Sequence, residues 1–162
     1  MSRADIETII KKSVVCRLAF SHDNRPYVVP LNFGFEGNTL YFHSAGEGRK
    51  LEIMKKNNHV CFEFDTGVEL VKSDRACGWG ARYHSVIGFG RALFVEETDK
   101  KRDALNHIMR QYSDVSWEYT DANLKNVTVF KVIIDEITGK KSQEETERYA
   151  PTKADGTDHQ KL

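Results

Sequence analysis

Two adjacent basic residues, Arg49 and Lys50, follow a glycine-rich turn and open a predicted helix. The turn reads AGEG at residues 45–48, and apolar residues with helical spacing begin at Leu51. Unpaired backbone N–H groups and the positive end of the helix dipole favour an anion at such a start. A guanidinium beside an ammonium adds to that preference. The pattern predicts a phosphate site, but a basic first turn that is only solvated would have the same sequence.

The segment before this turn predicts a β-hairpin with one bulky and one small face. Residues 27–35 alternate in size, and the large side chains are expected to face the core: Tyr27, Val29, Leu31, Phe33 and Phe35. The small face leaves room for a flat ring, with the Asn32 amide as donor and acceptor. Residues 36–38 are a predicted turn, and residues 39–44 are the returning strand.

Hydrophobic periodicity outlines the elements that must position these residues. A capping box at residues 2–5 opens a first helix with an apolar stripe of Ile6, Ile9 and Ile10. Further helices are predicted at 48–57 and from a cap at Thr98. Strands are predicted at 14–20, 26–35, 39–44, 60–64, 68–71, 83–95 and 127–134, with close backbone approach at Gly88 and Gly90. Many strands and few helices predict a mainly β barrel with peripheral helices.

Length and charge limit the classes of function. A chain of 162 residues with 40% hydrophobic content predicts one domain, placed at 1–140, followed by a polar tail at 141–162. The 24 basic and 24 acidic residues balance, so no nucleic-acid partner is expected. No apolar run approaches the roughly 20 residues that span a bilayer, and no signal-peptide core is present. We therefore expect a cytoplasmic protein without a membrane partner.

The three cysteines are too widely spaced to predict a disulfide framework or a zinc site. Cys16 and Cys61 lie in apolar strand runs and are expected in the core. Cys77 lies in the turn-rich stretch ACGWG and is expected in a loop. The sequence thus predicts no metal site.

Three blocks of sequence resemble a known family. They are residues 16–64, the run WGARYHSVIGFGRA at 79–92, and EITGK at 136–140. Together they resemble the pyridoxamine 5′-phosphate oxidase-like flavoproteins and, more narrowly, the 5-nitroimidazole resistance branch. The resemblance implies a mainly β (β/α+β) split β-barrel with peripheral helices. It also implies an obligate homodimer with FMN, or alternatively FAD, in the grooves between subunits.

The resemblance assigns cofactor contacts to particular positions. Arg49 and Lys50 would hold the phosphate, and the segment from Trp79 to Val86 would close over the cofactor from the facing subunit. The implied cofactor-binding residues are Val29, Pro30, Leu31, Asn32, His43, Ser44, Arg49, Lys50, Trp79, Arg82, Ser85 and Val86.

His43 is the candidate catalytic side chain. The tetrapeptide FHSA at 42–45 resembles the resistance proteins, which place a histidine of this strand beside the substrate pocket. A neutral imidazole there could donate a hydrogen bond or shuttle a proton. A hydrogen-bonded structural histidine would fit the same position, so both roles stay open.

The function implied by the resemblance is an FMN-dependent oxidoreductase that reduces small nitroaromatic compounds such as 5-nitroimidazoles. The Arg-Leu-x-Pro ending of the pyridoxamine phosphate oxidases is missing, so we do not expect oxidation of pyridoxine phosphate. No G-x-G-x-x-G unit is present, which leaves the electron donor open. The alternatives are a haem-binding or haem-handling protein on the same barrel and a non-catalytic flavin-binding module.

Overall fold

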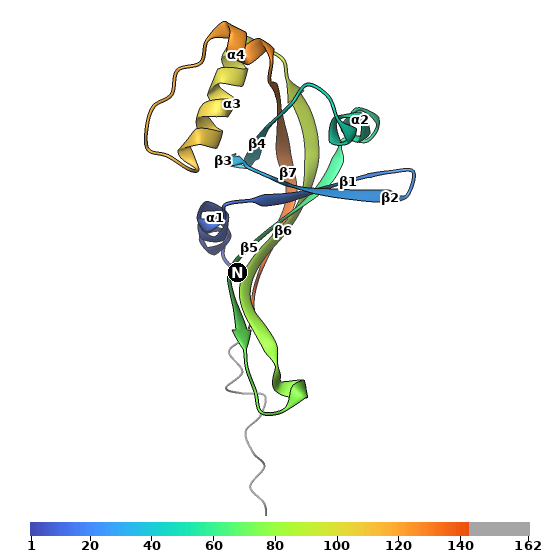
Figure 1. Ribbon diagram of the computed structural model, residues 1–162, viewed down its shortest axis with the longest axis vertical. Helices are drawn as coiled ribbons and strands as arrows, with labels where there is room; N and C mark the ends of the chain where they lie inside the picture. The colour runs from blue at the N-terminus through green and yellow to red at the C-terminus, as the bar shows by residue number, and fades with distance from the viewer. Residues whose placement is uncertain (143–162) are drawn as a thin grey trace, which may run out of the picture.

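The structure, a computed structural model that describes residues 1–142, is built on one seven-stranded antiparallel sheet (Figure 1). The strand order is β2-β1-β5-β6-β7-β4-β3. The strands are β1 (Cys16–His22), β2 (Arg25–Leu31), β3 (Gly34–Glu36), β4 (Thr39–Ser44), β5 (His59–Val71), β6 (Gly80–Val95) and β7 (Thr128–Lys141). The helices are α1 (Arg3–Lys12), α2 (Arg49–Lys56), α3 (Thr98–Arg110) and α4 (Asp121–Lys125), with a 3-10 turn at Ala76–Gly78. The predicted mainly β class is confirmed.

The core lies on the inward face of the sheet. Its largest fully buried side chains include six phenylalanines: Phe20, Phe33, Phe42, Phe62, Phe64 and Phe130. The predicted stripe of α1 is confirmed, because Ile6, Ile9 and Ile10 are buried in the same cluster. The predicted capping box also forms, with Ser2 and Asp5 bonding to each other's backbone N–H groups. Full burial of one of these phenylalanine or isoleucine side chains contributes about 1.5–3 kcal/mol to the stability of the fold.

The predicted strand over residues 26–35 is two strands, which corrects the predicted hairpin. β2 pairs along its whole length with β1, whereas β3 pairs with β4. The chain changes partner at Phe33, whose N–H donates to the Tyr112 hydroxyl at 2.9 Å instead of to a ladder partner. The predicted bulky face is nevertheless confirmed, because Phe33 is fully buried and the other large side chains pack against the core.

The two short strands predicted at 60–64 and 68–71 are a single strand, β5. Its register shifts between Thr66 and Glu69, and Gly67 has φ of +62° at this irregularity. β5 and β6 form a long arm that runs away from α2 (Figure 1). A Cβ on Gly88 would overlap the Phe62 ring, and one on Gly90 would overlap the backbone of β7. The predicted close approach at both glycines is confirmed.

The helices after β6 differ from the prediction. Thr98 is the first residue of α3 rather than its cap, because Glu97 holds the extended N-cap position without a capping hydrogen bond. The five-residue α4 is too short for its periodicity to predict it, although Thr120 and Asn123 form a capping box at its start.

The described chain extends slightly past the predicted domain end. β7 runs to Lys141, and the rest of the predicted tail, residues 143–162, lies outside the described residues. All three cysteines are free; Cys16 is buried, Cys77 is exposed, and Cys61 is only half-buried, contrary to its expected core position. Cys61 alternates with buried neighbours on β5 and so faces outward. Within residues 1–142, no helix has the length and apolar character needed to cross a membrane.

Candidate functional site

The glycine-rich turn leads into α2 through an uncapped helix start. Gly48 is the N-cap at φ of +130°, which residues with a side chain rarely adopt. The N–H groups of Leu51 and Glu52 donate to the Gly48 carbonyl at 2.9 and 3.2 Å. Among the described residues, the N–H groups of Arg49 and Lys50 have no partner. The predicted helix start is confirmed, and it presents two free donors at the positive end of its dipole.

Ser44 ends β4 immediately before this turn and carries an unsatisfied hydroxyl. The residue is only 7% exposed, and its Oγ has no hydrogen-bond partner within residues 1–142. A buried hydroxyl without a partner costs about 1–3 kcal/mol. An oxygen-rich group bound at the turn would recover that cost, which fits the phosphate or ribityl chain expected near Ser44.

His43 projects from the outward face of β4, opposite in direction to the buried Ser44. Desolvation by the surrounding protein lowers the pKa of His43 below its usual value, and the positive charge of Lys50 lowers it further. The imidazole is therefore neutral near pH 7 and offers one N–H donor and one acceptor nitrogen. This state suits hydrogen bonding or proton transfer, the two actions expected of His43.

Arg49 and Lys50 reach toward different elements. The Arg49 guanidinium carbon lies 4.9 Å from the centre of the Tyr27 ring on β2, whereas Lys50 lies close enough to His43 to affect its pKa. Both residues adjoin the uncapped helix start, as predicted. The neighbours of the two side chains thus lie on different strands, β2 for Arg49 and β4 for Lys50. Sequence reasoning missed Tyr27 as a partner of Arg49, because helical spacing gives no information about contacts with another strand.

The expected ring-lining residues of β2 and the adjoining link divide between two faces. Pro30 and Asn32 are exposed, whereas Val29 and Leu31 are half-buried against the core. This alternation follows from the two-residue period of a strand. Side chains of Pro30 and Asn32 are thus accessible to a ligand, while Val29 and Leu31 face the core.

The residues expected to act across a subunit boundary lie on and beside the β5–β6 arm, apart from α2 within one chain (Figure 1). Trp79 is 50% exposed, and its indole N–H donates to the Ser73 carbonyl at 2.6 Å. Arg82 is exposed and Ser85 is half-buried. Val86 is fully buried in its own core, so its side chain is not presented to a second subunit.

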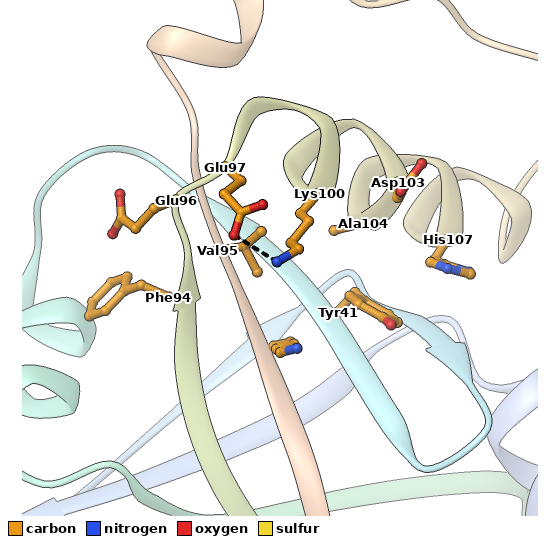
Figure 2. A pocket seen from close by; sticks show the side chains of 10 residues that line it. Tyr41, Phe94, Val95, Glu96, Glu97, Lys100, Asp103, Ala104 and His107 are labelled. Carbon is orange, nitrogen blue, oxygen red and sulfur yellow. Dashed lines mark hydrogen bonds and ion pairs between the residues drawn. The ribbon is translucent and has the colours of Figure 1, made fainter.

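A cavity of about 440 Å³ lies under α3, beside β4 (Figure 2). Tyr41 and His107 stack on one wall with ring centres 4.7 Å apart, and Lys100 pairs with Glu97 at 2.6 Å at the other end. None of the residues expected to bind the cofactor lines this cavity. Tyr41 and His43 share the outward face of β4, however, so the cavity adjoins the strand that carries the candidate site. Sequence reasoning missed it because α3 and β4 meet only in the fold.

Comparison with known proteins identifies the family. A family model described as pyridoxamine 5′-phosphate oxidase matches residues 2–141. The chain belongs to this family. Its fold is the split β-barrel of flavin-binding proteins, as expected.

Solved structures agree with this assignment. A proposed 5-nitroimidazole antibiotic resistance protein from Bacteroides thetaiotaomicron is 40% identical with a TM-score of 0.77, and the match covers 85% of this chain and 82% of that one. The FAD and haem binding protein from Mycobacterium smegmatis has a TM-score of 0.80 at 19% identity, covering 88% and 72% of the two chains. An FAD-binding protein from Mesorhizobium loti has a TM-score of 0.65 at 23% identity, covering 88% and 96%. At such low identity these last two support the fold alone.

One curated relative matches a shorter stretch. An uncharacterized protein from Rhizobium meliloti is 33% identical over 63 residues, which make up 39% of this chain and 41% of that protein. The match thus spans less than half of that relative.

Proposed function

We propose that the chain binds a flavin nucleotide through its riboflavin-linked phosphate and acts as an oxidoreductase on small nitroaromatic compounds. The observation that carries this proposal is the unsatisfied Ser44 hydroxyl beside the uncapped, basic start of α2. These groups offer hydrogen bonds and positive charge to a phosphate. The 40% identity with the proposed 5-nitroimidazole resistance protein supports the substrate class.

Each residue of the proposed site has a separate role, which follows from its position. Lys50 and the two free N–H groups of α2 hold the phosphate, and Ser44 donates to the phosphate or the ribityl chain. The exposed Asn32 amide orients the edge of the ring system. A bound flavin would supply the redox chemistry, a two-electron transfer from a donor to the nitro group. The neutral His43 donates a hydrogen bond where the acceptor gains negative charge, or relays a proton by accepting one at its free ring nitrogen as it releases the proton on the other.

We also propose that the working form is a homodimer joined through the outward face of the sheet. Val28, Ala19, Cys61 and Phe89 form one row across β2, β1, β5 and β6. In a single chain Val28 is 59% and Phe89 is 52% exposed. Contiguous exposed apolar surface of this kind favours burial against a second copy. The partner's arm would then place its Trp79, Arg82 and Ser85 near the cofactor, as the family resemblance implies.

The test begins with the absorption spectrum of the purified protein and mass spectrometry of any released cofactor. We expect the released cofactor to be a flavin. NADH or NADPH should reduce the bound flavin under anaerobic conditions, and a 5-nitroimidazole should then reoxidise it. Haem in place of flavin would contradict the proposal. A reduced flavin that no nitroaromatic reoxidises would leave a flavin-binding module and refute the proposed activity.

A double variant tests the phosphate assignment. Arg49→Ala with Lys50→Ala should lose most of the bound flavin while keeping the fold, because both cations at the helix start are removed. Lys11→Ala with Lys12→Ala removes the same charge from the last turn of α1 and should retain flavin. Normal occupancy in the first double variant would show that the phosphate lies elsewhere.

A further inference from the structure

The divergence of the two cations at the start of α2 has a structural cause. Successive residues of an α-helix point about 100° apart around the axis. Lys50 is near enough to His43 on β4 to lower the pKa of that imidazole, and Arg49 extends over the Tyr27 ring on β2. The cation–π contact holds the Arg49 guanidinium in that second direction. A single phosphate at Lys50 therefore leaves Arg49 available to a second anionic group.

Arg49 lines a hollow that lies beyond the helix start. This hollow, about 190 Å³ in volume, lies between the β1–β2 hairpin and α2. Its basic residues are Arg49, Arg25 and Lys56, and none of the three forms an ion pair within residues 1–142. Three unpaired cations on one hollow predict an anionic ligand.

The acidic residues of the hollow do not cancel this charge. Asp23 lies 3.3 Å from Nε2 of His22, which is charged only when protonated, so the Asp23 carboxylate still counts. The three cations Arg25, Arg49 and Lys56 nevertheless exceed the two carboxylates Asp23 and Glu52 by one charge. A carboxylate among phosphate-binding groups also has a use, because it accepts hydrogen bonds from ribose hydroxyls.

We propose that this hollow is the subsite for the second phosphate of a flavin dinucleotide, so that the chain selects FAD over FMN. The inference rests on the proposed flavin function and deepens it. Lys50 and the free N–H groups take the riboflavin-linked phosphate, and Arg49 bridges to the second phosphate. Arg25 and Lys56 hold that phosphate, and Glu52 accepts from the adjacent ribose.

The total charge of the cofactor does not explain a preference for FAD over FMN. The phosphate monoester of FMN carries a charge of about −1.5 to −2 at pH 7. The pyrophosphate of FAD carries a similar total, with one negative charge on each of its two phosphorus centres. The cations of this chain are spread in the same way, so their spacing distinguishes the two flavins.

The experiment compares FAD, FMN and riboflavin on the cofactor-free full-length protein by titration calorimetry. We expect FAD to bind more tightly than FMN, and FMN more tightly than riboflavin. Arg25→Gln with Lys56→Gln should weaken FAD by about fivefold and leave FMN and riboflavin unchanged, because two solvent-exposed charge contacts are lost. Lys55→Gln is the matched control on the same helix, since Lys55 lines a different hollow with Gly46.

The outcomes distinguish a failure of the proposed FAD subsite from a failure of the proposed flavin function. FMN that binds as tightly as FAD, or a double variant that weakens both flavins equally, would overturn the FAD subsite and leave flavin binding intact. Failure of all three flavins to bind would overturn the proposed function itself. If the double variant does not fold, the wild-type ratio of FAD to FMN affinity still decides the question.

Discussion

The guanidinium carbon of Arg49 lies 4.9 Å from the centre of the Tyr27 ring, which connects the first residue of α2 to the middle of β2. β2 pairs with β1, and α2 also packs on β1. The Arg49–Tyr27 contact therefore connects α2 directly to β2, two elements that share β1 as a neighbour. The charged group is thereby held in place before any ligand arrives. Such pre-organisation reduces the entropy that binding must otherwise overcome.

Tyr27→Leu should weaken the binding of FAD by about two- to fivefold, since an exposed cation–π contact contributes about 0.5–1 kcal/mol. Tyr27→Phe keeps the ring and should bind as the wild type does. Riboflavin affinity is the internal control, because it lacks the phosphate that Arg49 would serve. An equal loss for riboflavin in Tyr27→Leu would show that Tyr27 acts through packing alone.

Lys50→Gln should raise the pKa of His43, because it removes a positive charge that disfavours the imidazolium. The lowered pKa of His43 means that the unfolded chain binds more protons there than the folded chain does. Stability is therefore lost as the pH falls through the usual histidine range and then through the folded pKa, and Lys50→Gln should reduce that loss. NMR titration of the His43 ring protons measures the shift.

Lys55→Gln, on the same helix, is the control for this titration. The His43 pKa should not change in that variant, because Lys55 is not among the charges that affect it. An unchanged His43 pKa in Lys50→Gln would show that burial alone sets its value.

The sequence predicted the parts of the site that depend on local order. The helix start at Arg49, the inward and outward alternation over residues 27–35, and the close approach at Gly88 all follow from residue type and spacing. It did not predict that β2 and β3 are separate strands, since the Tyr112 hydroxyl that takes up the Phe33 N–H comes from beyond α3. The sequence also did not predict the direction of the Arg49 side chain, because Tyr27 becomes its neighbour only after the sheet has formed.

Gly34→Ala should destabilise the protein by about 1–3 kcal/mol, the usual cost of overpacking. A Cβ at Gly34 would overlap the backbone of His107, and a helix backbone cannot move aside as a flexible side chain can. α3 would have to shift away from β3, which would also disturb the stacked Tyr41 and His107 rings. Urea unfolding measures the loss, and Gly80→Ala is the control because a Cβ there meets open space. Equal stability of the two variants would contradict the close docking of α3.

Phe89→Glu should convert the proposed dimer to a monomer, as measured by analytical ultracentrifugation. Phe89 is 52% exposed on the outward face of β6, in register with Cys61 on β5. A carboxylate at this position would be desolvated in the interface without an opposite charge, and each such burial is strongly unfavourable. The single chain should still fold, because the side chain already faces outward from the core.

Val115→Glu is the control for this prediction, since Val115 is 64% exposed and lies in the loop after α3, where it lines a hollow with Met109 and Arg110. It should leave the oligomeric state unchanged. The monomeric Phe89→Glu variant should also lose flavin, because the proposed site is completed by Trp79, Arg82 and Ser85 of a second copy. A monomer that retains full flavin affinity would show that one chain holds the cofactor by itself, and a Phe89→Glu dimer would place the interface on another face.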